Sequence, residues 1–428
     1  MTVELLALII VAVLLAQVSF VLLVELYRRK RQYREIDVRI SEPRAVSESR
    51  DTTPSSADEP NVTAASWEGF REFRVQRREI EDGNRSICSF YLVPIDGQPL
   101  PSYRPGQFLT FRLKVEDPMT HQPKTLVRCY SLSDRPRPDY YRVSIKRVPA
   151  PADHPEVPPG TSSNFFHDHV QEGSTLLVKA PSGHFHLMEE EPLPVVLISG
   201  GIGITPMLSI INTLLEGGSQ REVWLYYGVR NGAEQIMKEP LRELVRMHSN
   251  FHLHVCYSNP NGDEVAGVDY QHKGRVDIPL LRSTLKLMRS QFYVCGPKPM
   301  MENLVPGLEE WGVDIDDIHY ESFGPASLIK HEKPKTGPEG ISAQAITVTF
   351  SKTGTRVPWN PDAESLLEFA EAQGIEVESG CRAGSCGCCQ TTLETGEIEY
   401  SQQPDADVEP GHCLLCISTP KGDLTLAA

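Results

Sequence analysis

The chain has 428 residues, 40% of them hydrophobic and 23% charged, which is typical of a globular protein with several domains. Its formal net charge of −15 at pH 7 argues against nucleic acid as a partner, because phosphate binding needs a basic surface. The ten cysteines are unevenly placed, with six of them between Cys381 and Cys416. Such clustering in a large chain favours metal or redox chemistry over a disulfide framework.

The N-terminus carries an apolar run over residues 5–24, interrupted only by Gln17 and Ser19. This length spans the ~30 Å hydrocarbon core of a bilayer. Several Lys and Arg follow the run and none precedes it. The pattern predicts a single-pass membrane anchor over residues 1–27, with the N-terminus outside and the later domains cytoplasmic. A cleaved signal peptide is the alternative, but it would need basic residues before a shorter apolar core.

Two segments have the composition of linkers. After the basic cluster, residues 41–66 are rich in Ser, Thr, Pro, Glu and Asp without apolar periodicity, so residues 28–66 are predicted to form a flexible tether. The stretch HEKPKTGPEG places a second linker at residues 330–340. The remaining chain divides into blocks at residues 67–188, 189–329 and 341–428.

The first block contains short alternating segments, including residues 108–115 and 140–146, between Pro/Gly turns. Their two-residue period and the lack of a long helix predict an antiparallel β-barrel. The block also contains PGQF, RCYS and GTSSNFFHD, beginning at residues 105, 128 and 160. In an extended RCYS segment, Arg128 and Tyr130 point the same way, where they suit a phosphate and a planar cofactor.

Together and in this order, these motifs resemble the flavin-binding barrel of the ferredoxin–NADP reductase superfamily. The resemblance implies that the RxYS residues contact the flavin ring and phosphate. It also implies that the GxxS segment cradles the phosphate from a helix N-terminus. The flavin-binding set is therefore Arg128, Tyr130, Ser131, Lys146, Gly160, Ser163 and Asn164. Two H-x-H pairs, at 167/169 and 184/186, are interpreted as surface or turn histidines rather than zinc ligands, since no carboxylate or cysteine pattern accompanies them.

The second block opens with a buried-strand pattern at residues 194–199, followed by GGIGITPMLSII. Gly201 and Gly203 fit the dinucleotide pattern G-x-G-x-x-G, while Pro206 replaces its third glycine. Thr205 is predicted to cap the following helix, and Pro206 suits the first helical turn. The loop formed by Gly200, Gly201 and Gly203 would let a pyrophosphate approach the helix N–H groups.

Later apolar segments at residues 222–228, 251–257, 291–295 and 318–321 alternate with helical patterns, which predicts a parallel, doubly wound α/β sheet. With the glycine loop, YVCGPKPMM and HYESFGP look like the pyridine-nucleotide half of the same superfamily. The resemblance implies that Cys295 lies beside the nicotinamide with Gly296 and Pro297, and that Glu321 and Phe323 lie near the flavin. Cys295 and Glu321 are thus the predicted catalytic residues; alternatively, Cys295 is only a small buried side chain.

The choice between NADH and NADPH depends on groups that could bind a 2′-phosphate. Arg230 is the candidate, but no second basic residue stands near it in the sequence. NADH is therefore preferred, with NADPH as the alternative.

The third block begins with a predicted strand at residues 345–350 and a helix at 364–374, followed by CRAGSCGCCQ. The spacing C-x4-C-x2-C with a distant fourth cysteine is the plant-type [2Fe–2S] pattern. It assigns the ligands as Cys381, Cys386, Cys389 and Cys416, leaving Cys388 and Cys413 surplus. Structural zinc, which usually uses paired C-x2-C units, is the alternative.

Residues 341–428 resemble a plant-type ferredoxin, which implies an α+β, β-grasp domain. This block has thirteen Asp and Glu against four Lys and Arg. The excess is either a solvated surface or, as the resemblance favours, a steering surface for a basic partner protein.

The order of the three blocks resembles that of the phthalate dioxygenase reductases, and the first two resemble the reductase half of flavohaemoglobins. Phthalate-type reductases use FMN and lack an anchor, whereas GTSSNFFHD and HYESFGP are flavohaemoglobin-like and favour FAD. The resemblance implies a membrane-tethered oxidoreductase that passes hydride from NADH to flavin. Single electrons would then pass through a [2Fe–2S] cluster to a separate acceptor, such as an oxygenase, hydroxylase or desaturase.

Two other functions remain open. The flavoprotein subunit of a respiratory NADH:quinone complex combines similar parts, but there the ferredoxin precedes the flavin block. A membrane-localised redox sensor is less consistent with a complete nucleotide site.

Overall fold

The computed structural model describes residues 67–116, 122–150, 158–286, 288–323, 346–382, 384, 386–401, 403–404 and 406–428. The predicted anchor, tether and 330–340 linker lie outside these residues. Within the described residues, no helix has the length and apolarity needed to cross a membrane.

The first block folds as a six-stranded antiparallel sheet in the order β4-β3-β6-β1-β2-β5. A bridge between Leu132 and Val143 and a 2.8 Å hydrogen bond from Ser133 N to Arg142 O join the segment after β4 to β5. The two edges of the sheet therefore meet, as expected for a small barrel. The strands are β1 (Arg71–Ile80), β2 (Ile87–Pro94), β3 (Phe108–Glu116), β4 (Pro123–Ser131), β5 (Tyr141–Lys146) and β6 (Thr175–Ser182).

One helix of this block, α2 (Thr161–His169), covers part of the barrel core. Its Phe166 is fully buried against Phe90 and Phe111. The prediction of a surface or turn position was wrong for His167, which lies buried in α2 with Nε2 2.9 Å from Ile145 O. The backbone carbonyl of β5 gives the imidazole a partner inside the fold.

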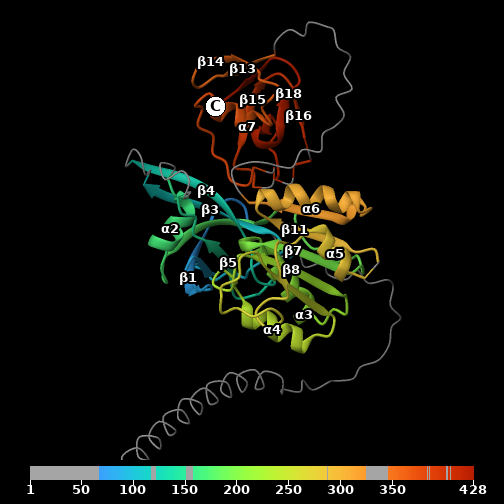
Figure 1. Cartoon of the computed structure of the whole chain (residues 1–428). Helices are drawn as coiled ribbons and strands as arrows, with labels where there is room; N and C mark the ends of the chain where they lie inside the picture. Colours follow the sequence, from blue (N-terminus) through green and yellow to red (C-terminus); the bar gives the residue numbers. More distant parts are fainter. Residues whose placement is uncertain are drawn as a thin grey trace, which may run out of the picture. The chain divides into compact units, whose positions relative to one another are not determined.

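The second block contains a parallel six-stranded sheet in the order β10-β9-β8-β7-β11-β12, which confirms the doubly wound prediction. The helices α3 (Ile204–Glu216) and α4 (Lys238–Met247) cover one face, and α5 (Ile278–Thr284) and α6 (Lys298–Glu310) cover the other (Figure 1). The strands are β7 (Val195–Gly200), β8 (Val223–Val229), β9 (Phe251–Tyr257), β10 (His272–Lys273), β11 (Gln291–Gly296) and β12 (Ile318–Ser322).

Strand β7 is apolar on both faces because it lies in the middle of the sheet. Its alternate residues pack into the two hydrophobic cores on opposite sides of the sheet. Val195 and Leu197 pack with α3, whereas Val196 and Ile198 pack with α6. The strand order reverses between β7 and β11. Open α/β sheets bind ligands in the crevice at such a switch point.

The third block has a mixed five-stranded sheet in the order β14-β13-β19-β15-β17, a two-stranded sheet β16-β18, and one main helix, α7 (Leu366–Ala372). Ser365 begins α7 by accepting a 3.2 Å hydrogen bond from Glu368 N. The arrangement agrees with the α+β prediction. Its strands are β13 (Thr347–Phe350), β14 (Thr355–Pro358), β15 (Gln390–Thr395), β16 (Ile398–Tyr400), β17 (His412–Leu414), β18 (Ser418–Pro420) and β19 (Leu424–Leu426).

Candidate functional site

The glycine loop after β7 meets the end of β11 at the switch point. Gly201 has a φ of +55°, a left-handed conformation that favours glycine. A Cβ on Gly203 would lie 2.2 Å from Cys295 O, and one on Gly200 would lie 2.7 Å from Pro297 Cδ. The two loops can therefore approach this closely only because side chains are missing.

Thr205 does not cap α3, contrary to the prediction. The 3₁₀ turn η1 (Gly201–Gly203) runs directly into α3, so Gly203 occupies the cap position and no side chain completes it. Thr205 is the second helical residue, and its hydroxyl donates a 3.0 Å hydrogen bond to Ile202 O. Pro206 remains in the first turn, where its missing N–H is tolerated.

Three chemically distinct side chains converge from separate elements beside this loop. Cys295 on β11 and Glu321 on β12 are partners across the parallel ladder. Ser131, at the end of β4, donates a long 3.5 Å hydrogen bond to Glu321 Oε2. Residues of the barrel and of the nucleotide sheet are thus brought together across 190 positions of sequence.

Burial controls the protonation of this group. Burial raises the pKa of Glu321 to about 8, while the Ser131 hydroxyl acts in the opposite direction. Burial also raises the pKa of Cys295 well above its ordinary value, and the Glu321 carboxylate adds to this. The thiol therefore stays protonated at neutral pH, and the carboxyl can hold a proton there.

The RCYS segment forms the end of β4. Tyr130 Oη lies 2.8 Å from Ser162 Oγ, and its ring packs edge-on against Phe111 and Phe166. Arg128 is exposed, and its guanidinium donates a 2.7 Å hydrogen bond to Val127 O. The sequence did not reveal the contact between Ser162 and Tyr130, because the two residues lie 32 positions apart.

Gly160, Ser163 and Asn164 form the start of α2. Gly160 is the cap residue, and no side chain bonds to the helix from it. Ser163 Oγ donates to Gly160 O (3.1 Å), and Asn164 Nδ2 donates to Val148 O (2.8 Å). These side chains hold the turn in place, while the first N–H groups of a helix without a side-chain cap are suited to a phosphate.

Glu234 connects two predicted cofactor-binding residues. Its Oε2 lies 3.8 Å from Lys146 Nζ, and its Oε1 lies 3.6 Å from Arg230 Nη1. Sequence reasoning missed Glu234, although its position four residues after Arg230 was visible. Phe323, just after β12, is 38% exposed.

The four predicted cluster cysteines lie together in the third block. Cys381 N donates to Cys386 Sγ and Cys386 N to Cys381 Sγ, both at 3.3 Å. Cys416, on the 3₁₀ turn η3 (Leu415–Ile417), lies within hydrogen-bonding reach of the Cys389 thiol. Gly384 and Gly387 have φ values of +76° and +68°, which the tight turn between the ligands requires.

This donor set fits a [2Fe–2S] cluster. Cys381 and Cys386 are in contact, and Cys416 lies within hydrogen-bonding reach of both Cys389 and Cys381, while Cys386 also meets Cys129 and Cys388. A binuclear cluster with four cysteines needs one pair for each iron, which the neighbouring pairs 381/386 and 389/416 can supply. Within the described residues, no three or more His, Cys, Asp or Glu side chains are arranged to hold one metal ion, whereas each iron of a binuclear cluster would use only two of the four cysteines. Of the two surplus cysteines, Cys413 packs in the domain core, as Cys389 and Cys416 also do, and Cys388 Sγ donates to Cys386 O at 3.6 Å.

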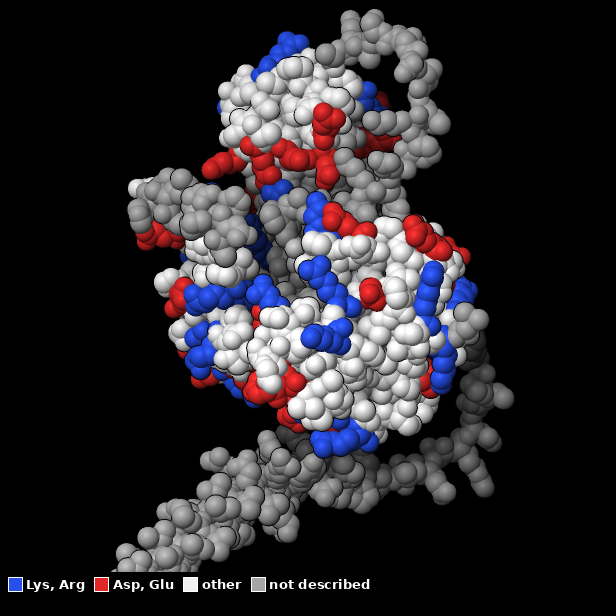
Figure 2. All heavy atoms as spheres, viewed as in Figure 1, with Lys and Arg blue, Asp and Glu red and all other residues white. Residues whose placement is uncertain are grey.

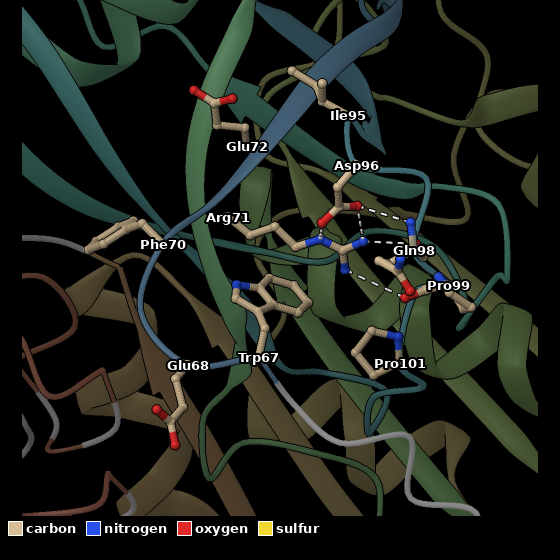
Figure 3. Close-up of a pocket in the computed structure, with 10 residues that line it drawn as sticks. All are labelled: Trp67, Glu68, Phe70, Arg71, Glu72, Ile95, Asp96, Gln98, Pro99 and Pro101. Atoms are coloured by element: carbon tan, nitrogen blue, oxygen red, sulfur yellow. Dashed lines mark hydrogen bonds and ion pairs between the residues drawn. The ribbon is translucent and has the colours of Figure 1, made fainter.

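A groove of about 690 Å³ on the barrel contains none of the predicted site residues. Figure 3 shows Arg71 extending across it to Asp96, with the Trp67 ring beside the guanidinium. Its lining thus includes the structural ion pair of Arg71 and Asp96.

Two segments of the chain match known protein families. Residues 197–305 match the oxidoreductase NAD-binding domain, and residues 348–421 match the 2Fe-2S iron-sulfur cluster binding domain. The second match includes all four predicted cluster cysteines.

Among curated relatives, a flavohemoprotein of Halalkalibacterium halodurans is 39% identical over 272 residues, covering 64% of each chain. A flavohemoprotein of Chromobacterium violaceum is 40% identical over 258 residues, covering 60% of this chain and 61% of that protein. The chain thus spans somewhat less than two thirds of the length of these relatives.

Among solved structures, the FAD/NAD-binding domain of nitric oxide dioxygenase from Vibrio cholerae is 31% identical, with a TM-score of 0.52. The match covers 60% of this chain and 100% of that domain. An intact type IV self-sufficient cytochrome P450 monooxygenase shares the fold over 88% of this chain and 43% of its own, with 22% identity and a TM-score of 0.54.

Proposed function

We propose that this chain, an NAD(P)H-dependent flavin and iron–sulfur oxidoreductase, belongs to the ferredoxin–NADP reductase superfamily and delivers electrons from NADH to a separate acceptor protein. Bound FAD would supply the conversion between a two-electron hydride donor and a one-electron cluster. The chain provides the binding sites, their orientation and their electrostatics.

The convergence of Ser131, Cys295 and Glu321 carries this proposal. Cys295 and Gly296 are small and end a strand at the switch point, which leaves room for a nicotinamide to lie against a flavin. A Glu321 carboxyl with a pKa of about 8 can hold a proton beside them. Cys295 acts through its size, because its raised pKa disfavours the thiolate.

The proposed preference for NADH rests on Glu234. Glu234 lies in the loop that follows β8, and a carboxylate there suits a ribose diol and repels a 2′-phosphate. Here the Glu234 carboxylate also partly neutralises Arg230, the one candidate for binding that phosphate.

The proposed acceptor is an oxygenase, hydroxylase or desaturase with a basic docking surface. Figure 2 shows acidic side chains gathered on the domain that carries β13–β19. Exposed carboxylates on and around α7 include Asp362, Glu364, Glu368 and Glu376. The proposal includes the predicted single-pass anchor over residues 1–27, with the catalytic domains in the cytoplasm.

An anaerobic NADH titration of the purified full-length protein tests the proposed electron path. Flavin absorbance and the EPR signal of the reduced cluster are followed together. We expect the flavin to bleach and the cluster signal to appear within the same titration. A flavin that NADH does not reduce, or protein that contains neither cofactor after mild purification, would refute the proposed function.

A further inference from the structure

Two adjacent rows of side chains lie on one face of β6, β3 and β4. The first row consists of cross-strand partners, Lys179 on β6, Thr110 on β3 and Cys129 on β4. The second row lies two residues further along each strand and consists of Leu177, Arg112 and Val127. Cross-strand partners point to the same face of a sheet. Thr110 is 0% exposed and Val127 is 3% exposed, so this face is covered.

The segment leading into the cysteine loop covers this face. Lys179 Nζ donates a 2.8 Å hydrogen bond to Cys386 O, although the two residues lie 207 positions apart. Arg112 Nη2 lies 3.6 Å from Glu378 Oε2. Gly380 packs so closely that a Cβ there would lie 3.0 Å from Val127 Cγ1 and 3.5 Å from Cys129 Sγ.

The two cations are themselves held in place. The ring of Phe70 lies 5.6 Å from Lys179 Nζ and 4.1 Å from the Arg112 guanidinium carbon. Cation–π contacts of this kind restrict long, flexible side chains. The Phe70 ring therefore helps to orient the Lys179 ammonium group toward the loop carbonyl.

The same strand, β4, carries the proposed flavin residues. Arg128 and Tyr130 alternate along it with Val127 and Cys129, and alternate residues of a strand point to opposite faces. One face of β4 thus presents Arg128 and Tyr130, while Val127 and Cys129 on the other face contact the segment that leads to Cys386. A single strand separates the two proposed cofactor sites.

We propose that Lys179 is a positioning residue that fixes the cluster loop against β4 for electron transfer between flavin and cluster. This inference rests on the proposed function. In the step concerned, one electron leaves the reduced flavin and one arrives at the oxidised cluster. The charge of Lys179 is unchanged.

The test compares Lys179→Met, Lys179→Arg and a matched control, Lys114→Met, in the full-length holoenzyme. Lys114 is exposed on the same face of β3, and its side chain makes no hydrogen bond or ion pair within the described residues. Stopped-flow spectroscopy follows flavin reduction and cluster reduction separately, and hydrogen–deuterium exchange reports on residues 378–390.

We expect Lys179→Met to slow cluster reduction about tenfold and to accelerate amide exchange in the loop, because a charge-assisted hydrogen bond is lost. Flavin reduction by NADH should be unchanged, Lys179→Arg should restore most of the rate, and Lys114→Met should match the wild type. Equal effects of Lys179→Met and Lys114→Met, or no effect of either, would overturn the inference.

A charge swap provides an independent test of the same docked geometry. Arg112→Glu should accelerate amide exchange in the loop, and adding Glu378→Arg should reverse that effect; additive effects in the double variant would contradict the docked geometry.

The exchange measurement also separates this inference from the proposed function, because amide exchange needs no NADH. A wild-type flavin that NADH fails to reduce would therefore refute the proposed function, while the exchange data would still decide whether Lys179 holds the loop.

Discussion

The Glu321 carboxyl shows how a fold changes the chemistry of a single residue. Its ordinary pKa of 4.5 would leave it ionised at neutral pH, whereas burial raises the pKa to about 8. Its neighbour Cys295 is held as a neutral thiol by the same burial. The pair thus offers one small apolar surface and one titratable proton near neutral pH.

This shifted pKa predicts a pH-dependent stability. Between about pH 4.5 and pH 8 the folded protein binds a proton that the unfolded chain has released, so the free energy of unfolding falls as the pH rises. Glu321→Gln should remove about 2 kcal/mol of this dependence, a value reduced for partial exposure of the carboxyl. Urea unfolding of the flavin-free protein at the two ends of this range measures it.

Glu310→Gln is the matched control for that prediction, because Glu310 is exposed on α6. Its stability profile should follow that of the wild type. Identical profiles for Glu321→Gln and the wild type would show that the carboxyl is not held protonated by the fold.

Gly203 illustrates a position where the backbone tolerates no side chain. Gly203→Ala would place a methyl group 2.2 Å from Cys295 O, so one of the two loops must move. We expect a loss of about 2 kcal/mol of stability, as for other overpacked sites, and weaker NADH binding. Thermal unfolding and NADH titration measure the two effects.

Gly262→Ala is the control for this prediction, since nothing lies within 4 Å of the Cβ it would add. It should leave both NADH binding and unfolding unchanged. Wild-type NADH affinity in Gly203→Ala would exclude the loop from the nucleotide site.

At the scale of elements, the cysteine loop combines tight turns with neighbouring packing. Among the described residues of the loop, Arg382, Gly384 and Gly387 have positive φ. A Cβ on Gly384 would lie 2.5 Å from Ile417 Cδ1, beside Cys416. The loop thus folds closely around the turn that carries the distant fourth cysteine, as a shared cluster requires.

The cysteine spacing distinguishes the predicted ligands from the surplus cysteines. Cys386→Ser should abolish the visible absorbance and EPR signal of the cluster, because it removes one of two paired sulfurs. Cys388→Ser should retain the full iron content. Loss of iron in Cys388→Ser together with its retention in Cys386→Ser would reverse the ligand assignment.

At the scale of the whole molecule, charge is distributed unevenly between domains. The excess of acidic residues in block 341–428 would accelerate encounters with a basic protein. Cytochrome c is a suitable basic probe acceptor, and its NADH-dependent reduction should slow several-fold as salt rises from about 20 mM to about 500 mM. Ferricyanide is the control, since a small anion should not show this loss. A salt-independent rate with cytochrome c would contradict steering.

Local patterns predicted much of this fold correctly. The segment at residues 251–257 coincides with β9, and the predicted helix at 364–374 contains α7. In both cases the apolar pattern and the turn residues at its two ends are local features of the sequence. Thr205 was assigned wrongly as a cap because the 3₁₀ turn before α3 shifts the helix start, which local capping preferences do not reveal.

The sequence by itself determined the composition of the sites. The cysteine spacing and the glycine loop are patterns of residues close together in the sequence, so they can be recognised without knowledge of the fold. Tertiary structure alone brought Ser131 to Glu321, joined Glu234 to Lys146 and placed Lys179 at Cys386 O. These contacts join strand ends and surfaces that the packing of separate sheets brings together. Neither periodicity nor spacing encodes which distant residues will meet there.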